Sequence, residues 1–475
     1  MRAVVVGGGP NGLAGAAVLA RAGLEVTVLE AADVVGGGTR SGEAIVDGLL
    51  HDHCSAVHPL AVGSPLFDEL DLGAHGLVWR YPEIDCAHPL DDGSAGVLHR
   101  SVAETVAGLG DDGAAWRRLF EDGAHGFDEL RHDVLGPLVR VPKHPISLAR
   151  FGIPALAPAT VLARTFQRPQ TRALWAGVAA HAYTRLDRPL SSSIGLGILT
   201  AGHRYGWAVA EGGSQRIADA LVSVGRAAGV SIETGVRVTS AAQVADADVV
   251  LWDLAPAAVA EILEDRLPSR ASRALRRFRR GPGAWKLDLA VEGGVPWRNE
   301  AARRAGTVHV GGTIEEIAAA EADVVAGRMP ERPFVLVGQQ YLADPGRSVG
   351  HVHPVWAYAH VPHGYDRDCE ATILDQIERF APGFRDRVVG TQATRPGDFA
   401  AWNPNFVGGD ILTGAKDVRQ LVFGPRIGRH PYDTGLDGHY LCSAATPPGP
   451  GAHGMCGAHA ARRALAAEGL AQPLS

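Results

Sequence analysis

The first thirty residues show a regular change in hydrophobic pattern. An apolar run at positions 3–6 meets a glycine-rich turn, an alanine- and leucine-rich stretch follows at 13–22, and a β-branched run at 25–30 ends on Glu30. A short apolar run bounded by glycine is typical of a buried strand, and a longer one rich in small residues is typical of a helix packed on it. The pattern therefore predicts a β-α-β unit.

Further along, the pattern becomes helical and then returns to alternating strands and helices. Residues 105–200 carry apolar positions at helical spacing, interrupted by prolines. The polar–apolar alternation at 286–291 predicts a half-buried antiparallel strand. Helices are also predicted at 216–228 and 455–467, and strands at 230–233, 236–238, 248–253, 333–340, 355–360 and 438–443.

These elements predict an interleaved α/β fold. A second glycine loop at 448–454 precedes the last helix, so segments of nucleotide-binding type recur along the whole sequence. We predict a discontinuous Rossmann-type domain made of residues 1–100, 205–285 and 400–475. Residues 101–204 and 286–399 are predicted to form an α+β substrate-binding domain with a mixed sheet and a helical cap.

The first glycine turn matches a dinucleotide-binding motif. Gly7, Gly9 and Gly12 fit G-x-G-x-x-G, and Glu30 lies 18 residues after Gly12. These glycines allow the tight turn, the close approach of a pyrophosphate, and the packing of helix on strand. The helix that begins near Asn11 directs its free N–H groups at the phosphates. A carboxylate at Glu30 suits an unphosphorylated ribose, so the expected nucleotide is FAD or NAD and not NADP.

Composition narrows the class of protein. Hydrophobic residues make up 46% and charged residues 20% of the 475 positions, which is typical of a globular chain. The net charge is −7 and no long basic run is present, so nucleic-acid binding is not expected. The densest basic stretch, 273–280, is interpreted as a solvated helix end, with a peripheral contact to an anionic membrane or an acidic partner as the alternative.

The cysteines indicate a reducing environment. There are five, none spaced as C-x-x-C, so neither a zinc ribbon nor a redox dithiol is predicted. The sequence opens on its first strand and holds no run of about 18 apolar residues, so we expect neither a signal peptide nor a membrane span. A cytoplasmic location is the expectation.

Several blocks resemble one family of flavoproteins. Residues 30–41, 51–59, 211–215 and 440–449 are similar to conserved blocks of the amine-oxidase and phytoene-desaturase type. Residues 380–385, 403–405, 408–410 and 453–457 are most similar to the branch of pyridine nucleotide-disulfide oxidoreductase domain-containing protein 2. The resemblance implies a glutathione-reductase-like fold in its amine-oxidase variant, with FAD as cofactor and the flavin between the two domains.

The resemblance also implies the residues that bind FAD. The glycine turn would hold the pyrophosphate, Glu30 the ribose, and the backbone of Val236 the adenine. Gly37, Gly38 and Arg40 would lie along the phosphates and the flavin edge. The C-terminal block would bring the last helix to the ribityl and pyrimidine end of the flavin. The full set is Gly7, Gly9, Pro10, Asn11, Gly12, Glu30, Gly37, Gly38, Arg40, Val236, Ser443, Ala444, Gly451, His453, Gly454 and Met455.

The C-terminal block departs from the family in two places. Many relatives have an aspartate where this chain has Ser443 and Ala444, so the ribityl contact must differ. Pro450 stands where close relatives have glycine, which restricts φ in the loop. A helix N-terminus beside the N1–C2=O edge of a flavin would stabilise the anionic reduced form.

The predicted function is oxidation, or desaturation, of a bond in an apolar or amphipathic small molecule by hydride transfer to the flavin. Only one dinucleotide motif is present, so electrons are expected to come from the substrate and to leave to oxygen, a quinone or another carrier. Two alternatives stay open. One is a redox-neutral isomerase that uses reduced FAD, and the other is a non-catalytic binding protein like the Rab GDP-dissociation inhibitors.

No catalytic residue is predicted, and the candidate pocket residues have a structural alternative. His53, beside Asp52, would either orient substrate or pin the flavin loop. Trp356, Tyr358 and His360 alternate on one predicted strand, where they would line an aromatic pocket or pack on helices.

Other histidines and cysteines carry no predicted role in catalysis. His351 and His353 would share a strand face, but no third ligand is visible, so ordinary hydrogen-bonded histidines are expected and no metal is predicted. Cys442 and Cys456 are expected to be inert buried thiols. The oligomeric state is not predicted.

Overall fold

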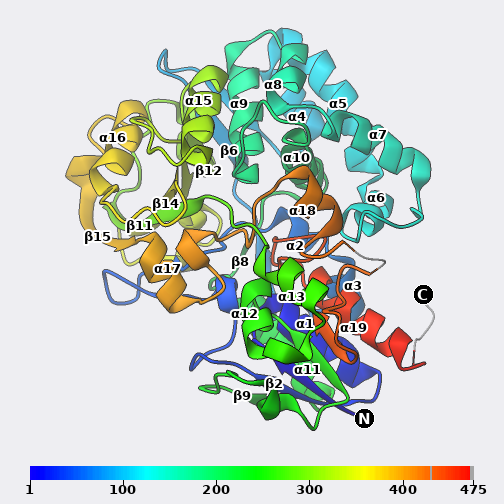
Figure 1. Ribbon diagram of the computed structural model, residues 1–475. Helices are drawn as coiled ribbons and strands as arrows, with labels where there is room; N and C mark the ends of the chain where they lie inside the picture. Colours follow the sequence, from blue (N-terminus) through cyan, green and yellow to red (C-terminus); the bar gives the residue numbers. More distant parts are fainter. Residues whose placement is uncertain (428–429, 471–475) are drawn as a thin grey trace.

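Two sheets organise the protein, and the chain passes between them repeatedly (Figure 1). The computed structural model describes residues 1–427 and 430–470. The smaller sheet has five parallel strands in the order β16-β10-β1-β2-β9. Their bounds are Arg2–Val6 (β1), Glu25–Leu29 (β2), Ser231–Glu233 (β9), Val249–Trp252 (β10) and His439–Leu441 (β16). The predicted β-α-β unit is confirmed, with α1 (Pro10–Arg21) joining β1 to β2.

Side-chain alternation in β1 buries both faces of this sheet. Ala3 and Val5 pack in one core with α1, α11 (Gln215–Ala227) and α19 (Met455–Ala467), while Val4 and Val6 pack in another with α12 (Pro256–Ile262) and α13 (Ser269–Arg276). Figure 1 shows α19, in red, beside the blue α1. The last helix therefore covers the first strand.

The larger sheet is mixed and has seven strands in the order β15-β11-β14-β13-β12-β6-β7. Only the β12–β6 pair is parallel. The bounds are Ile84–Pro89 (β6), Ala95–Leu98 (β7), Gly283–Glu292 (β11), Ala305–Val310 (β12), Val335–Gly338 (β13), Val352–Val361 (β14) and Val388–Thr394 (β15). The predicted mixed sheet is thus confirmed.

Helices cover both faces of the mixed sheet. On one face, Trp356 and Tyr358 of β14 share a core with α9 (Pro169–Ala179) and α15 (Ile314–Val325). On the other, Val355 and Ala357 share a core with α14 (Glu300–Arg304) and α16 (Glu370–Phe380). Strand β11 is therefore buried from Gly283 to Val291, so the prediction of a half-buried strand there is wrong.

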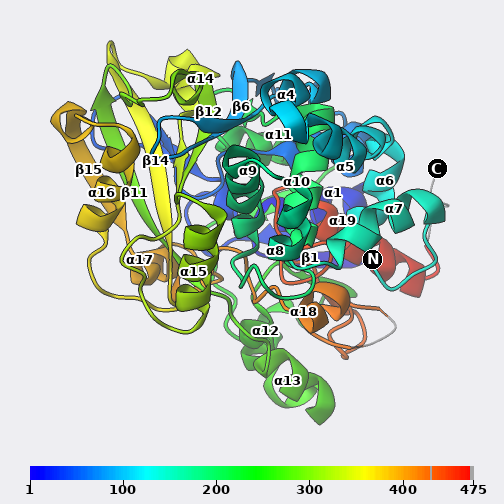
Figure 2. The same cartoon turned by 90° about the horizontal axis from the view of Figure 1, so that it is seen from above.

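The predicted helical cap consists of several short helices. They are α4 (Val102–Gly108), α5 (Gly113–His125), α6 (Phe127–Val134), α7 (Pro145–Ala155), α8 (Ala159–Leu162), α9 and α10 (Ser192–Tyr205). Seen from above, α5, α6 and α7 lie at the edge of the molecule opposite β15 (Figure 2). Smaller elements are the hairpin β3 (Ser41–Glu43) and β4 (Leu50–Asp52), the pair β5 (Trp79–Arg80) and β8 (Val209–Ala210), and α2 (Pro59–Val62), α3 (Pro65–Leu70), α17 (Pro396–Trp402) and α18 (Val418–Phe423).

Two further details differ from the sequence prediction. Strands β6 and β7 lie within the segment 1–100 but pair inside the mixed sheet, because β6 runs parallel to β12 more than two hundred residues away. Residues 236–238 form no strand, since the N–H of Val236 donates to the carbonyl of Glu30 just beyond the end of β2.

Candidate functional site

A cavity of about 1660 Å³ lies between the two sheets. Its wall includes Gly7 and Gly9 at the end of β1, and it also includes Trp356 and Tyr358 of β14. Pockets for drug-sized ligands have volumes of about 300–1,000 Å³. This cavity therefore has room for a dinucleotide at one end and a second small molecule at the other.

The glycine turn after β1 leaves no room for side chains. Gly7 has φ +104°, and a Cβ atom on Gly9 would lie 2.5 Å from Oδ2 of Asp253. A Cβ atom on Gly12 would lie 2.1 Å from the carbonyl oxygen of Gly7. The turn thus brings backbone to the cavity surface, as a phosphate-binding turn must. Pro10 and Asn11, which begin α1, also line the cavity.

Glu30 follows β2 and faces the cavity with its carboxylate held by backbone N–H groups. Oε2 accepts from Gly8 at 2.6 Å and Oε1 from Ala32 at 2.8 Å. Val236 also lines the cavity. The N–H of Val236 donates to the carbonyl of Glu30, with 2.8 Å between N and O. The carbonyl of Val236 is therefore the group that could accept a hydrogen bond from an adenine amino group.

Asp253 is a cavity residue that sequence reasoning missed. It follows β10, and its Oδ2 accepts from the N–H of Gly12 at 3.0 Å, which caps α1 from a neighbouring strand. Burial, together with the charge of Glu30, raises the pKa of Asp253 to about 7. The signal that could have found it is an acid directly after a buried strand, since ligands bind at the carboxyl ends of parallel strands.

The predicted cofactor residues between positions 37 and 40 form another part of the cavity wall. Gly37, Gly38 and Arg40 all line the cavity. Arg40 donates from Nη2 to the carbonyl of Trp402 at 2.8 Å, and its guanidinium lies 3.9 Å from the centre of that indole ring. Burial lowers the pKa of Arg40, although the charge of Glu30 opposes this. The side chain is therefore held rigidly at the edge of the cavity.

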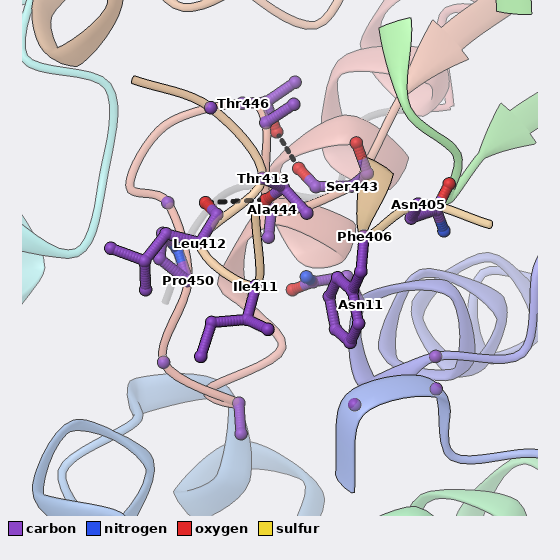
Figure 3. Close-up of a pocket in the computed structure, with 18 of the residues that line it drawn as sticks. Asn11, Asn405, Phe406, Ile411, Leu412, Thr413, Ser443, Ala444, Thr446 and Pro450 are labelled. Atoms are coloured by element: carbon purple, nitrogen blue, oxygen red, sulfur yellow. Dashed lines mark hydrogen bonds between the residues drawn. The ribbon is translucent and has the colours of Figure 1, made fainter. Parts of the chain in front are cut away.

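The C-terminal loop lines the same space from the opposite side (Figure 3). Ser443, Ala444, Gly451 and His453 are all cavity residues. Nδ1 of His453 accepts from the N–H of Met455 at 3.1 Å, and burial lowers the pKa of His453 to about 3, so the ring is neutral. His453 therefore caps the N-terminus of α19.

Three predicted cofactor residues lie behind the wall instead of on it. Gly12, Gly454 and Met455 do not line the cavity, and the Met455 N–H is taken by His453. A Cβ atom on Gly454 would lie 2.9 Å from the Cβ of Ala14 in α1. Gly454 therefore allows α19 to cross α1 closely, and the predicted cofactor contacts of Gly12, Gly454 and Met455 stay predictions.

Some buried polar atoms at the dinucleotide end have no hydrogen-bond partner among residues 1–427 and 430–470. They are Oδ1 of Asn11, Oγ of Ser443 and Nε2 of His453. Buried polar groups in proteins are nearly always paired, so each needs a partner from a bound molecule or water. Together with the glycine turn and Glu30, they fit a dinucleotide lying from Val236 to the C-terminal loop.

The predicted pocket residues of β14 separate into two groups. Trp356 and Tyr358 line the cavity, as predicted, but His360 lies behind them. Nδ1 of His360 is 2.6 Å from Oε1 of Glu321, and its ring centre is 3.7 Å from that of Tyr183. His360 is fully buried because the strand continues past the cavity into the helical layer.

His53 also lies outside the cavity wall. Its ring centre is 5.4 Å from Trp402, and burial lowers its pKa. Neighbouring Asp52 is buried and pairs with Arg347, 2.6 Å between Oδ2 and Nη1, while its Oδ1 accepts from the N–H of Ser214. The contacts of Asp52 favour the structural interpretation, in which it pins the loop.

A second buried charge cluster lies on β11. Lys286 and Asp288 form an ion pair, and Nδ1 of His51 is 3.2 Å from Oδ1 of Asp288. Burial would raise the pKa of Asp288, but Lys286 and His51 outweigh burial and hold the pKa below its ordinary value. Neither β11 residue lines the cavity.

His181 is the second cavity residue that sequence reasoning missed. Its Nε2 lies 3.0 Å from Nε2 of His309, and burial lowers the pKa of His181 to about 3, so the ring is neutral at physiological pH. It lies near Trp207, with 6.1 Å between the ring centres. No local motif marks this residue, because its place depends on how α9 packs on the mixed sheet.

The remaining chemical candidates have structural roles. Arg276 and Arg280 of the basic stretch line the cavity and donate to the carbonyls of Ala260 and Asn405, and Arg276 and Arg277 are both exposed. Burial raises the pKa of Cys456 to about 12, which fits the expected inert thiol. His353 bonds Ser348 through Nδ1 at 2.8 Å. Among residues 1–427 and 430–470, no group of three histidine, cysteine or acidic side chains could hold a metal ion.

Comparison with known proteins gives consistent similarities. A family profile described as NAD(P)-binding Rossmann-like domain matches residues 5–71. Pyridine nucleotide-disulfide oxidoreductase domain-containing protein 2 of Rattus norvegicus is 24% identical, over 97% of this chain and 92% of its own length.

Solved structures agree with these sequence matches. An oxidoreductase from Methanosarcina mazei superposes with a TM-score of 0.65 at 18% identity, covering 98% of this chain and 100% of its own. Wild-type putrescine oxidase bound to putrescine superposes with a TM-score of 0.60 at 17% identity, covering 98% and 99%. The fold is therefore that of the amine-oxidase type, which confirms the predicted fold class, while the phytoene-desaturase part of the resemblance stays a prediction.

Proposed function

We propose that this chain, whose fold is of the amine-oxidase type and whose relatives include oxidoreductases, is an FAD-dependent oxidoreductase acting on an apolar or amphipathic small molecule. The observation that carries the proposal is one continuous cavity, with unpaired polar atoms and a glycine turn at one end and apolar and aromatic side chains at the other. Such a cavity suits a dinucleotide whose reactive end meets an apolar substrate.

The residues that would hold FAD are those of the dinucleotide end. The glycine turn and the start of α1 would bind the pyrophosphate, and Glu30 would accept from the ribose. Ser443 would donate its unpaired hydroxyl to the cofactor, and Arg40 would lie beside it. When bound, FAD supplies a two-electron acceptor for a hydride from the substrate.

The other end of the cavity would position the substrate. Trp356 and Tyr358 offer flat aromatic faces, and Phe151, Ile194 and Leu148 add further apolar wall. These side chains exclude water and hold a substrate carbon close to the acceptor, which hydride transfer requires. His181 is neutral and lines this part, so its imidazole can exchange a hydrogen bond with a polar group of the substrate.

The purified protein provides the test of this function. It should be yellow and show the visible absorption of an oxidised flavin at close to one flavin per chain. Incubation with a substrate under anaerobic conditions should bleach that absorption and leave it bleached. An oxidised spectrum that substrate leaves unchanged, with turnover only after the flavin has been chemically reduced, would instead support the isomerase. A colourless protein that takes up no FAD would support the binding protein.

Asp253 predicts a pH dependence of FAD affinity. Its pKa of about 7 means that the carboxyl group is largely protonated at pH 6 and ionised at pH 8. The ionised form would repel the anionic pyrophosphate, so the dissociation constant for FAD should rise with pH above 7 by up to about tenfold per unit. Titration of the apoprotein with FAD from pH 6 to 8 measures it.

Two variants serve as the comparison for that titration. Asp253→Asn should bind FAD with little change between pH 6 and 8. Asp246→Asn, which makes the same change at an exposed neighbouring site, should keep the wild-type dependence. An equally steep dependence in Asp253→Asn would assign the effect to another group.

A further inference from the structure

Exposed apolar side chains concentrate on one segment of the cap. Seven large hydrophobic residues between positions 138 and 161 are exposed, and we call them the apolar ridge: Leu138, Val139, Val141, Ile146, Ile153, Leu156 and Val161. Val141 is 90% exposed, and Ile146 and Ile153 are each 72% exposed. Exposed hydrophobic residues elsewhere on the described surface are scattered along the chain, so this segment needs its own explanation.

Helix α7 is apolar on two opposite faces. Ile146 and Ile153 lie two turns apart and point outward, whereas Leu148, Phe151 and Ala155 line the cavity. A helix at the surface of a globular protein has one polar face, and a helix that is apolar all round contacts apolar material on every side. The outer face of α7 therefore lacks its partner.

The apolar ridge reaches the cavity. Leu138 and Leu156 are exposed, at 47% and 61%, and both also line the cavity. Ile194 and Ile198 of α10 continue the apolar wall inward from them. One apolar surface thus runs from the outside of the protein into the end of the cavity assigned to the substrate.

The ridge segment itself carries only positive charges, although Asp122 and Asp133 border it and pair with Arg150 and Arg140. Between Asp133 and Asp187 the sequence contains seven lysines and arginines and no acidic residue, although the whole chain has a net charge of −7. Lys143, Arg150 and Arg164 are exposed beside the apolar side chains. An apolar face fringed by cations complements an anionic lipid surface.

The helices of the ridge are shaped to lie along a bilayer. Within residues 1–427 and 430–470, no single helix is long and apolar enough to cross a membrane. The pair 145–155 and 159–165 has the length and apolar content together but bends by 94° between them. Short apolar helices at an angle to one another fit the interfacial region of one leaflet.

We propose that the apolar ridge docks on the surface of an anionic phospholipid membrane. The cavity then opens at the acyl-chain boundary, so an apolar substrate enters from the lipid, a consequence that rests on the proposed function. This assigns membrane contact to residues 138–161 and not to the arginines at 273–280, two of which line the cavity instead.

Sedimentation with vesicles tests the docking. The flavin-loaded protein should bind vesicles of mixed phosphatidylcholine and phosphatidylglycerol. It should bind more weakly to pure phosphatidylcholine and at high salt. The triple variant Val141→Gln, Ile146→Gln and Ile153→Gln should bind at least tenfold more weakly, since each removed side chain is worth about tenfold.

A matched variant controls for the loss of surface hydrophobicity. The triple variant Val325→Gln, Val349→Gln and Val389→Gln changes exposed valines outside the ridge and should bind vesicles like the wild type. Lys143→Glu combined with Arg150→Glu should weaken binding to anionic vesicles while leaving binding to phosphatidylcholine unchanged. All variants should retain the wild-type flavin content.

Three outcomes would overturn the proposal. The wild-type protein fails to sediment with anionic vesicles, or the ridge variant sediments as well as the wild type does. In the third, light scattering shows a dimer that only the ridge variant abolishes, and vesicles do not compete with it, so a second copy of the chain covers the ridge. Failure of the proposed function looks different, because a colourless protein that binds vesicles would leave the docking surface standing.

Discussion

Replacing Gly457 with alanine is expected to strip the protein of its flavin and to lower its stability. Gly457 lies in the first turn of α19, and a Cβ atom there would lie 1.8 Å from the carbonyl oxygen of Asn11 and 2.9 Å from the N atom of Gly15. Both contacts are with the backbone of α1, so no side chain can move aside. The two helices would have to separate exactly where they build the cavity.

The expected loss in the free energy of unfolding follows from the overpacking of a rigid contact. Such changes cost about 1–3 kcal/mol and occasionally more, and a clash between two helix backbones belongs at the upper end, at about 3 kcal/mol. Chemical denaturation measures the loss, and the ratio of flavin to protein absorbance should fall by more than half. Asn11 at the start of α1 and His453 just before α19 both line the cavity. When the two helices separate, these two residues no longer face the cofactor together.

Gly108→Ala is the matched control. Gly108 ends α4 on the surface, and no atom lies within 4 Å of the position of its Cβ. Alanine there should leave the flavin content unchanged and should not destabilise the fold. If Gly457→Ala bound a full complement of flavin and melted with the wild type, the helix crossing would not support the site.

Arg347→Met is expected to cost about 3–5 kcal/mol, because it leaves a buried carboxylate without its partner. Arg347 is 1% exposed, and it donates to Asp52 at 2.6 Å, to Asp344 at 2.9 Å and to the carbonyl of Ala210 at 2.7 Å. Methionine keeps much of the volume and removes the charge. Urea denaturation at pH 7 gives the free energy of unfolding.

The pH dependence of that loss has a definite sign. Burial would raise the pKa of Asp52, but Arg347, with the bonds from Ser214 and Ser41, holds it below the ordinary value. In the wild type this carboxylate therefore stabilises the fold above the unfolded pKa of about 3.9, and the contribution is lost as pH falls through the folded pKa. In Arg347→Met the unpaired Asp52 has a raised pKa, so the gap to the wild type should narrow from pH 7 towards pH 4.

A double variant separates the ion pair from the packing. Asp52→Asn in the Arg347→Met background removes the unpaired charge and keeps the oxygen that accepts from Ser214. It should recover most of the lost stability. If the double variant were as unstable as Arg347→Met alone, the cost would come from lost packing and not from the buried charge.

Elements with complete local signals were predictable from the sequence. Strand β1, its glycine turn and α1 were predicted because the apolar run, the glycines and the small-residue helix lie next to one another. Strand β10 and helix α19 are also confirmed, the latter with the predicted ends. The cavity residues from Gly7 to Arg40 belong to the same local motifs.

Features that depend on distant pairing were not predictable. Asp253 reaches Gly12 only because β10 lies beside β1, and the two residues are 241 positions apart. Lys286 and Asp288 have the spacing of exposed strand residues, yet helices cover both faces of the mixed sheet and the two residues are buried. Strand β6 left its predicted domain for the same reason. The periodicity of a strand therefore predicts which of its side chains are buried only when the elements packed against it are known.

The crossing of α1 and α19 also has a consequence for how the protein is made. The helix that closes over strand β1 is synthesised about 450 residues after it. At roughly 5–20 residues per second, the ribosome needs about 25 to 90 seconds to supply it. During that interval the glycine turn is exposed without its cover, and a chaperone or a loosely held cofactor has time to shield the nascent chain.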